Sequence, residues 1–229
     1  MPLFDNLANK AARALSGAVN GAVSNAAGSA ERNVAQNAAQ NVAQAAAGGL
    51  RNLQNKRETI TFQVLPQNVA QLQALPQANL LSPYGTAALA IAAMCAYEQS
   101  PQAVAEMLNF LRGPRPLTNY DLQFMRDRLQ GKYYKTFSFF EGATPQNNYT
   151  PTAPYRVTVF DNPYSWVSED TSQSSGGPVQ YARLLMQSSG ADSPRFITLR
   201  LKPSTSQWFL WEHQLLPDIR IPAAADAWA

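Results

Sequence analysis

Residues 195–212 read RFITLRLKPSTSQWFLWE, and this stretch decides the fold that we expect. Two runs rich in aromatic and β-branched residues, 195–202 and 207–212, lie on either side of a turn that contains Pro203. Such runs, bounded by turn residues, are typical of β-strands. Three earlier runs have the same character and predict further strands at 135–141, 155–160 and 179–187.

Helices are predicted upstream of these strands. Ser82-Pro83 and Ser100-Pro101 each place a capping serine before a first-turn proline, which predicts helices to about residue 98 and residue 112. Thr118 or Asn119 caps a third helix, which ends at Gly131. A block of helices followed by a block of strands predicts an α+β domain with helices packed on an antiparallel sheet.

We place this α+β domain at residues 58–222. Its first strand begins near Thr59 and is closed by Pro66, and Ile219 with Ile221 is predicted to add an edge strand. A tail, residues 223–229, follows.

Residues 1–57 form a different segment, which we expect to be a long alanine-rich amphipathic helix with a hinge. Residues 17–48 divide into the tetrads GAVN, GAVS, NAAG, SAER, NVAQ, NAAQ, NVAQ and AAAG. A period of four turns the apolar stripe by about 40° per repeat. The stripe also buries little area, because its only sizeable side chains are Val19, Val23, Val34 and Val42. The helix therefore needs a partner or self-association.

The first residues carry a separate apolar face. Phe4, Leu7 and Leu15 share one side of a helix. This face could dock into a groove of a protein partner or of an export machinery, lie on an anionic membrane surface, or pack on the chain's own α+β domain. We favour a protein contact over a membrane surface.

Charge argues against nucleic acid as a ligand. The net charge is +3, but residues 1–57 hold six basic and two acidic residues, which leaves 12 bases and 13 acids in the rest. A folded domain with a charge near −1 lacks the basic surface that nucleic-acid binding requires. The four net charges of the N-terminal segment are a weak attraction to a membrane.

No catalytic or metal-binding set emerges from the sequence. His213 is the only histidine and Cys95 the only cysteine, and neither stands in a nucleophile motif. We expect no cofactor and no metal, and we expect Cys95 to be a buried core residue. Residues 1–16 lack the apolar stretch of a secretory signal, so we expect a cytoplasmic location, with export by a dedicated machinery left open.

The most concentrated feature is the run Trp208-Phe209-Leu210-Trp211. In a regular strand, Trp208 and Trp211 point to opposite faces. Either both are core residues beneath a sheet covered on both sides, or one face binds a partner, with Tyr164 and Trp166 completing an aromatic groove. The candidate binding residues are therefore Phe4, Leu7, Leu15, Tyr164, Trp166, Trp208 and Trp211.

Several stretches also resemble a known domain family. They are SGADSPR at 189–195, QWFLWE at 207–212, DIRIP at 218–222 and the opening MPLFDNLA. The chain resembles, over roughly residues 58–222, an uncharacterised family found mostly in anaerobic gut Firmicutes. The resemblance implies a bacterial source and a shared fold, and it assigns no activity.

The function that we expect is that of a non-enzymatic interaction or assembly protein, whose N-terminal helix self-associates or docks and whose α+β domain recognises a partner. The alternative is a small hydrolase or transferase that works through carboxylates such as Glu98 or Asp121. A catalytic carboxyl of that kind should lie in a cleft with a raised pKa.

Overall fold

The computed structural model describes residues 55–169 and 179–228. Contacts between residues divide the chain after Gln54, and the second unit, 55–229, contains all of the described elements. The expected N-terminal helix and its candidate residues Phe4, Leu7 and Leu15 lie outside the described residues.

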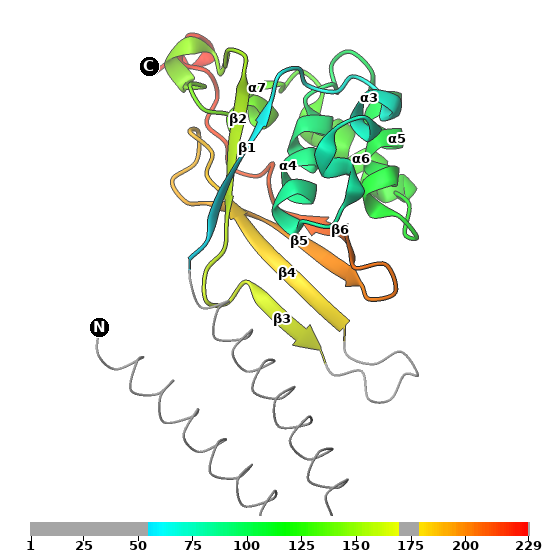
Figure 1. The fold of residues 1–229 in the computed structure, drawn as a ribbon. Helices are drawn as coiled ribbons and strands as arrows, with labels where there is room; N and C mark the ends of the chain where they lie inside the picture. The colour runs from blue at the N-terminus through cyan, green and yellow to red at the C-terminus, as the bar shows by residue number, and fades with distance from the viewer. Residues whose placement is uncertain (1–54, 170–178, 229) are drawn as a thin grey trace, which may run out of the picture. The chain divides into compact units, whose positions relative to one another are not determined.

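A six-stranded antiparallel sheet forms one layer of the domain (Figure 1). Five strands follow the order β1-β2-β4-β5-β6, and β3 pairs with the same edge of β4 as β2 does, further towards the start of β4. All neighbours are antiparallel, which confirms the predicted sheet. The strands are β1 (Arg57–Phe62), β2 (Tyr155–Phe160), β3 (Trp166–Glu169), β4 (Val179–Met186), β5 (Arg195–Lys202) and β6 (Gln207–His213).

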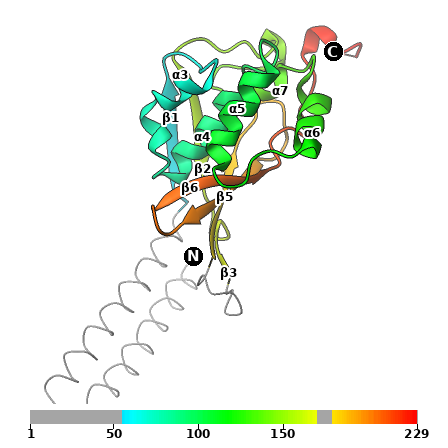
Figure 2. The same ribbon diagram turned by 90° about the vertical axis from the view of Figure 1, so that its right-hand side faces the viewer.

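The described helices form the second layer, on one side of the sheet (Figures 1 and 2). The predicted caps are present: Ser82 Oγ accepts the Gly85 N–H at 3.3 Å, and Ser100 Oγ accepts the Ala103 N–H at 3.1 Å. Thr118 begins a capping box with Asp121. The α-helices are α3 (Val69–Gln73), α4 (Pro83–Met94), α5 (Pro101–Arg112), α6 (Asn119–Leu129) and α7 (Tyr134–Phe137), and the 3-10 turns are η1 (Pro76–Asn79), η2 (Pro145–Asn147) and η3 (Ala223–Ala225).

Helix α4 is the centre of the core. Every residue from Pro83 to Met94 is buried, because α5 covers one side of the helix and the sheet covers another. Its many alanines let both neighbours approach closely, and the larger Leu89 and Ile91 fill the remaining space. The strands contribute one face to this core, for example Val157, Leu184 and Leu199, so their other face points away from the helices.

Two strand predictions are wrong, and one strand was missed. Residues 135–141 overlap the one-turn helix α7, and only Phe140 bridges to the sheet, at Val157. Ile219 and Ile221 form no strand: the Arg220 N–H instead bonds to the Gly190 carbonyl, and Ile219 is buried. The missed strand is β3, whose four residues Trp166–Glu169 are too short to show an alternating pattern.

Candidate functional site: the outer face of the sheet

The sheet face that points away from the helices carries a row of apolar side chains. In the strand register Phe160 of β2 lies opposite Leu185 of β4, and Leu185 lies opposite Phe196 of β5. All three side chains are only partly buried. We call this side of the sheet the outer face; the described helices lie on the other side (Figure 1).

Arginine side chains stack on the aromatic rings of the outer face. The guanidinium carbon of Arg57 lies 4.4 Å from the centre of the Phe160 ring, and that of Arg183 lies 3.7 Å from the centre of Phe196. Each such cation–π contact contributes on the order of 0.5–1 kcal/mol at an exposed site. The stacked guanidinium still presents its N–H groups at its edge, so it remains able to bind a carboxylate.

A groove continues this surface at the sheet edge, around Trp211. It has a volume of about 280 Å³ and lies between the segment after α5 and the β5–β6 hairpin. The Arg115 and Arg200 guanidinium groups lie 4.2 and 4.8 Å from the centre of the Trp211 ring. The lining residues, which we call the Trp211 groove, are Arg112, Pro114, Arg115, Arg200, Leu201, Lys202, Pro203, Phe209, Leu210 and Trp211.

An irregularity in β6 brings Trp211 to this position. Leu199 pairs with Leu210, but Thr198 pairs with Glu212, so Trp211 has no residue directly opposite it. An extra residue of this kind is a β-bulge, which re-aims a side chain. The Trp211 ring packs edge-on against Tyr181, at 5.8 Å between ring centres, and is partly exposed.

Trp208 and Trp166 meet each other elsewhere. Their rings pack edge to face with centres 5.8 Å apart. The backbone N–H of Trp208 donates to the Leu80 carbonyl. The Trp166 Nε1–H donates to the buried carboxylate of Asp161, at 2.9 Å, which also accepts the Tyr84 hydroxyl, at 3.0 Å. This pair therefore ties β3 and β6 to the packed side of the domain.

The aromatic groove expected from the sequence is thus divided. Trp166 joins Trp208, Trp211 lies in a different environment, and Tyr164 is 83% exposed. Trp208 and Trp211 are both partly buried, and Trp208 packs against the core. Sequence reasoning also missed the arginines that stack on Trp211 and Phe196, because those contacts depend on strand register.

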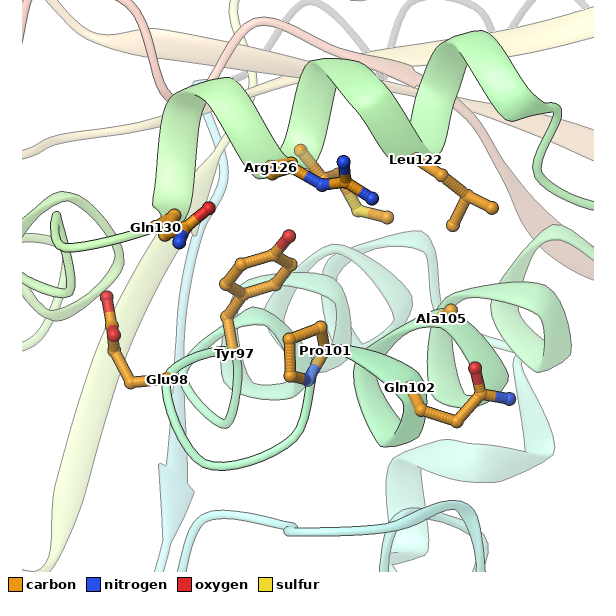
Figure 3. A pocket seen from close by; sticks show the side chains of 9 residues that line it. Tyr97, Glu98, Pro101, Gln102, Ala105, Leu122, Arg126 and Gln130 are labelled. Atoms are coloured by element: carbon orange, nitrogen blue, oxygen red, sulfur yellow. The ribbon is translucent and has the colours of Figure 1, made fainter.

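A second groove, of about 420 Å³, lies between the start of α5 and helix α6 (Figure 3). The Tyr97 hydroxyl points toward α6 in this view, on the side of Arg126. Burial raises the pKa of Tyr97, although Arg126 acts in the opposite sense, so the phenol is neutral. Glu98, one of the two carboxylates considered for catalysis, is exposed at this groove and accepts the Lys132 N–H at 3.2 Å.

Asp121, the other carboxylate considered, has a structural contact set. Burial acts to raise its pKa, but hydrogen bonds from Thr118 and the charge of Arg112, 3.7 Å away, outweigh burial and hold the pKa below its usual value. A carboxyl held ionised in this way caps α6 and is a poor proton donor. Asp121 therefore gives no support to carboxylate catalysis.

The other titratable candidates are His213 and Cys95. The His213 side chain is partly exposed, but its Nδ1 atom is buried without a hydrogen-bond partner in the described structure. Burial lowers the pKa of His213 to about 4, and Arg112 adds to this effect while Asp121 opposes it. Burial also raises the pKa of the Cys95 thiol to about 12, so this side chain is an unreactive core thiol.

Two further properties concern the described residues alone. Within residues 55–169 and 179–228, no three potential metal-ligating side chains come together. None of the helices in this part of the chain is both long enough and apolar enough to cross a bilayer.

A comparison with protein families gives one match. Residues 64–223 match the model of a family described as a domain of unknown function, DUF6935. The chain belongs to this family. Membership of an uncharacterised domain family is therefore confirmed, and the DUF6935 region includes both the outer face from β2 onward and the Trp211 groove. No curated protein and no solved structure matches the chain.

Proposed function

We propose that this DUF6935 protein is a non-enzymatic interaction protein whose α+β domain recognises a protein partner through the outer face of the sheet. The observation that carries the proposal is the row Phe160, Leu185 and Phe196, partly exposed on the side away from the helices and stacked with arginines.

The composition of this face suits protein recognition. An antiparallel sheet with one solvated face normally carries polar residues there. Here Tyr181 and Trp211 extend the apolar row toward the sheet edge, with Arg183 and Arg200 between the rings. Aromatic residues and arginine are the types that protein interfaces enrich and that contribute most of the binding energy.

The N-terminal segment has a separate part in this proposal. Its valine stripe, Val19, Val23, Val34 and Val42, supports self-association of the helix, and Phe4, Leu7 and Leu15 support docking to a protein. The sequence resemblance to domains of gut bacteria supports a bacterial source. We place the function in the bacterial cytoplasm.

Site-specific photo-cross-linking tests recognition by the outer face. Benzoylphenylalanine replaces Phe196 in the full chain, produced in the cells of its source. We expect a cross-linked product with one defined partner, which mass spectrometry identifies. The matched control replaces Tyr120, a tyrosine of α6 that is 77% exposed on the helical side of the domain, and should not give that product.

Affinity for the identified partner then decides the proposal. With the purified partner, Phe196→Ser in the full chain should weaken binding about tenfold or more, as loss of an interface anchor does. Tyr120→Ser should leave the affinity unchanged. The same product from both positions, or equal affinities for the two variants, would contradict recognition by the outer face. A cross-linked homodimer would identify a second copy of the chain as the partner.

A further inference from the structure

We propose that the Trp211 groove binds an acidic peptide segment of the protein partner, through carboxylate groups held by Arg115 and Arg200. This inference rests on the proposed function, because it names the chemistry of the partner that the adjoining outer face recognises.

The charge of the groove favours an acidic ligand. Four basic side chains line the groove, Arg112, Arg115, Arg200 and Lys202, and no acidic residue does. Arg112 is committed to the fold, since its Nε–H donates to the Arg115 carbonyl and it lies beside Asp121. The described structure contains no salt bridge or side-chain hydrogen bond from Arg115, Arg200 or Lys202 within residues 55–169 and 179–228.

The geometry of the groove favours a carboxylate. Trp211 lies within cation–π distance of both guanidinium groups, at 4.2 Å for Arg115 and 4.8 Å for Arg200. Stacking restricts the movement of each guanidinium while leaving its edge N–H groups available, and those groups match the two oxygens of a carboxylate. Because the arginines are positioned before the ligand arrives, less side-chain entropy is lost on binding.

The size and polarity of the groove favour a peptide. Pockets for drug-sized ligands and cofactors usually exceed about 300 Å³ and bury most of the ligand. The Trp211 groove, at about 280 Å³, lies at the lower limit of that range and is open to solvent, which suits a few side chains of an extended segment. Its apolar walls, which include Pro114, Pro203 and Phe209, can take an aliphatic residue beside the carboxylates.

Nucleic acid fits the same groove less well. A nucleic acid needs a long basic track that contacts many phosphates. The basic residues of the Trp211 groove lie at the sheet edge, and Glu212, which lines the adjoining outer face with Arg183, interrupts the surface there. Outside residues 1–57 the chain carries 12 bases and 13 acids, so a track of that kind has no continuation.

Fluorescence anisotropy with synthetic peptides tests the inference on the full chain. The probe is a dye-labelled decapeptide of glutamate with one central leucine, and its matched control replaces every glutamate by glutamine. We expect saturable binding of the glutamate peptide and about tenfold or weaker binding of the glutamine peptide. Raising the salt from about 50 to about 500 mM should weaken the glutamate complex, because salt screens exposed charges.

Variants then assign the binding to the groove. Arg115→Gln and Arg200→Gln should each weaken peptide binding about tenfold, with Lys202→Gln weaker in effect because a lysine binds as a point charge. The matched control is Arg156→Gln, an exposed arginine of β2 that lies 3.9 Å from Glu141. It should bind the peptide as the wild type does. Melting temperatures of all variants check that the fold is retained. If an arginine variant unfolds, Lys202→Gln tests the groove in its place, because the Lys202 side chain is exposed.

The outcomes separate this inference from the proposed function. Equal binding of the two peptides, or wild-type binding by Arg115→Gln and Arg200→Gln together, would overturn the acidic-peptide inference. A single-stranded 12-nucleotide DNA that displaced the peptide and lost affinity in the same variants would also overturn it. If Phe196→Ser abolishes partner binding while the groove variants bind the partner normally, the proposed function stands and the groove assignment fails.

Discussion

His213 connects the acidity of the medium to the stability of the domain. The ring packs edge-on against Phe124 of α6, with ring centres 6.5 Å apart, and Arg112 of α5 and Asp121 of α6 are the charged groups that act on it. Its pKa is lowered from 6.5 to about 4, mainly by burial, so the folded domain holds the ring neutral. Below pH 6.5 the unfolded chain takes up a proton that the folded chain excludes, and this proton favours unfolding.

We therefore predict that acid weakens the domain through His213. The contribution of this residue to the free energy of unfolding is constant above about pH 6.5. As the pH falls from about 6.5 to about 4, the free energy of unfolding decreases by up to about 3 kcal/mol. His213→Leu keeps a similar volume and removes the buried unpaired Nδ1, so at pH 7 it should be neutral or stabilising. Urea unfolding of both proteins at pH 7, 5.5 and 4.5 should show the variant losing less stability. Parallel curves would refute the assignment.

Gly113 is the second residue whose identity the structure explains. It ends α5 with φ of +58°, and an added Cβ would lie 2.5 Å from two ring carbons of Phe209. Gly113→Ala should therefore cost about 3 kcal/mol, from a strained backbone together with a displaced Phe209 ring. Gly131→Ala is the matched control, because its φ is +67° but no atom lies within 4 Å of the added Cβ. It should cost only about 1 kcal/mol. Thermal unfolding of both variants measures the difference, and equal losses would show that the Phe209 contact contributes nothing.

Single residues differ in how far sequence alone could place them. The caps Ser82, Ser100 and Thr118 were predicted correctly because capping depends on residues next to one another in the chain. Cys95 was also placed correctly, because a buried thiol fits an unbroken apolar run. The environment of His213 was not predicted, since it depends on two helices distant in sequence.

Strand β6 shows how one element can carry two tryptophans with different roles. The Trp208 ring packs on Trp166 and the Trp208 backbone N–H donates to the Leu80 carbonyl, whereas the bulge turns Trp211 onto Tyr181 and the stacked arginines. Trp208→Ala should lower the free energy of unfolding by about 2–3 kcal/mol, less than the loss for a fully buried tryptophan. Trp211→Ala should cost about 1 kcal/mol, mostly the two cation–π contacts.

Chemical denaturation of the two variants checks this prediction, and each serves as the control for the other. A Trp211→Ala variant less stable than Trp208→Ala would mean that Trp211 is a structural residue, and the outer face would then lose an anchor for a partner. Trp211→Ala should weaken binding of the glutamate peptide more than Trp208→Ala does, because Trp211 lines the Trp211 groove and Trp208 does not.

Most elements were predictable from their own sequence, and the errors have physical causes. Strands β2 and β5 have the predicted limits because both are runs rich in aromatic and β-branched residues that are bounded by turn residues. Residues 135–141 look like a strand by aromatic content, but Tyr134, Phe137 and Phe140 recur every three residues, a spacing that suits helical turns. Composition alone therefore favoured the wrong element.

At the scale of the whole molecule, the class α+β follows from the order of helices and strands, but the candidate site does not. Arg183 and Phe196 meet only through the register of β4 and β5, and Arg115 and Trp211, which are far apart in the chain, meet only through the segment after α5. A hydrophobicity pattern cannot reveal which exposed arginine stacks on which ring. The site was therefore visible in the sequence only as an excess of aromatic residues in β6.

We predict that the full chain assembles through residues 17–48. We expect the wild-type protein to exceed the mass of one chain, 25.0 kDa, at high concentration and to approach it on dilution. Replacing Val19, Val23, Val34 and Val42 by serine removes the only sizeable apolar side chains of the stripe. At roughly 1 kcal/mol for each valine, association should weaken by about a hundredfold or more.

The control for assembly substitutes serine at four polar positions of the same repeats, Asn20, Asn33, Asn37 and Asn41. Serine and asparagine have similar helix propensities, so this protein should associate as the wild type does. Light scattering over a dilution series measures all three proteins. Because the valine variant leaves the α+β domain unchanged, its melting temperature should match that of the wild type once both are dilute. A wild-type protein that is monomeric at every concentration would exclude self-association and leave docking to a different protein as the role of the N-terminal segment.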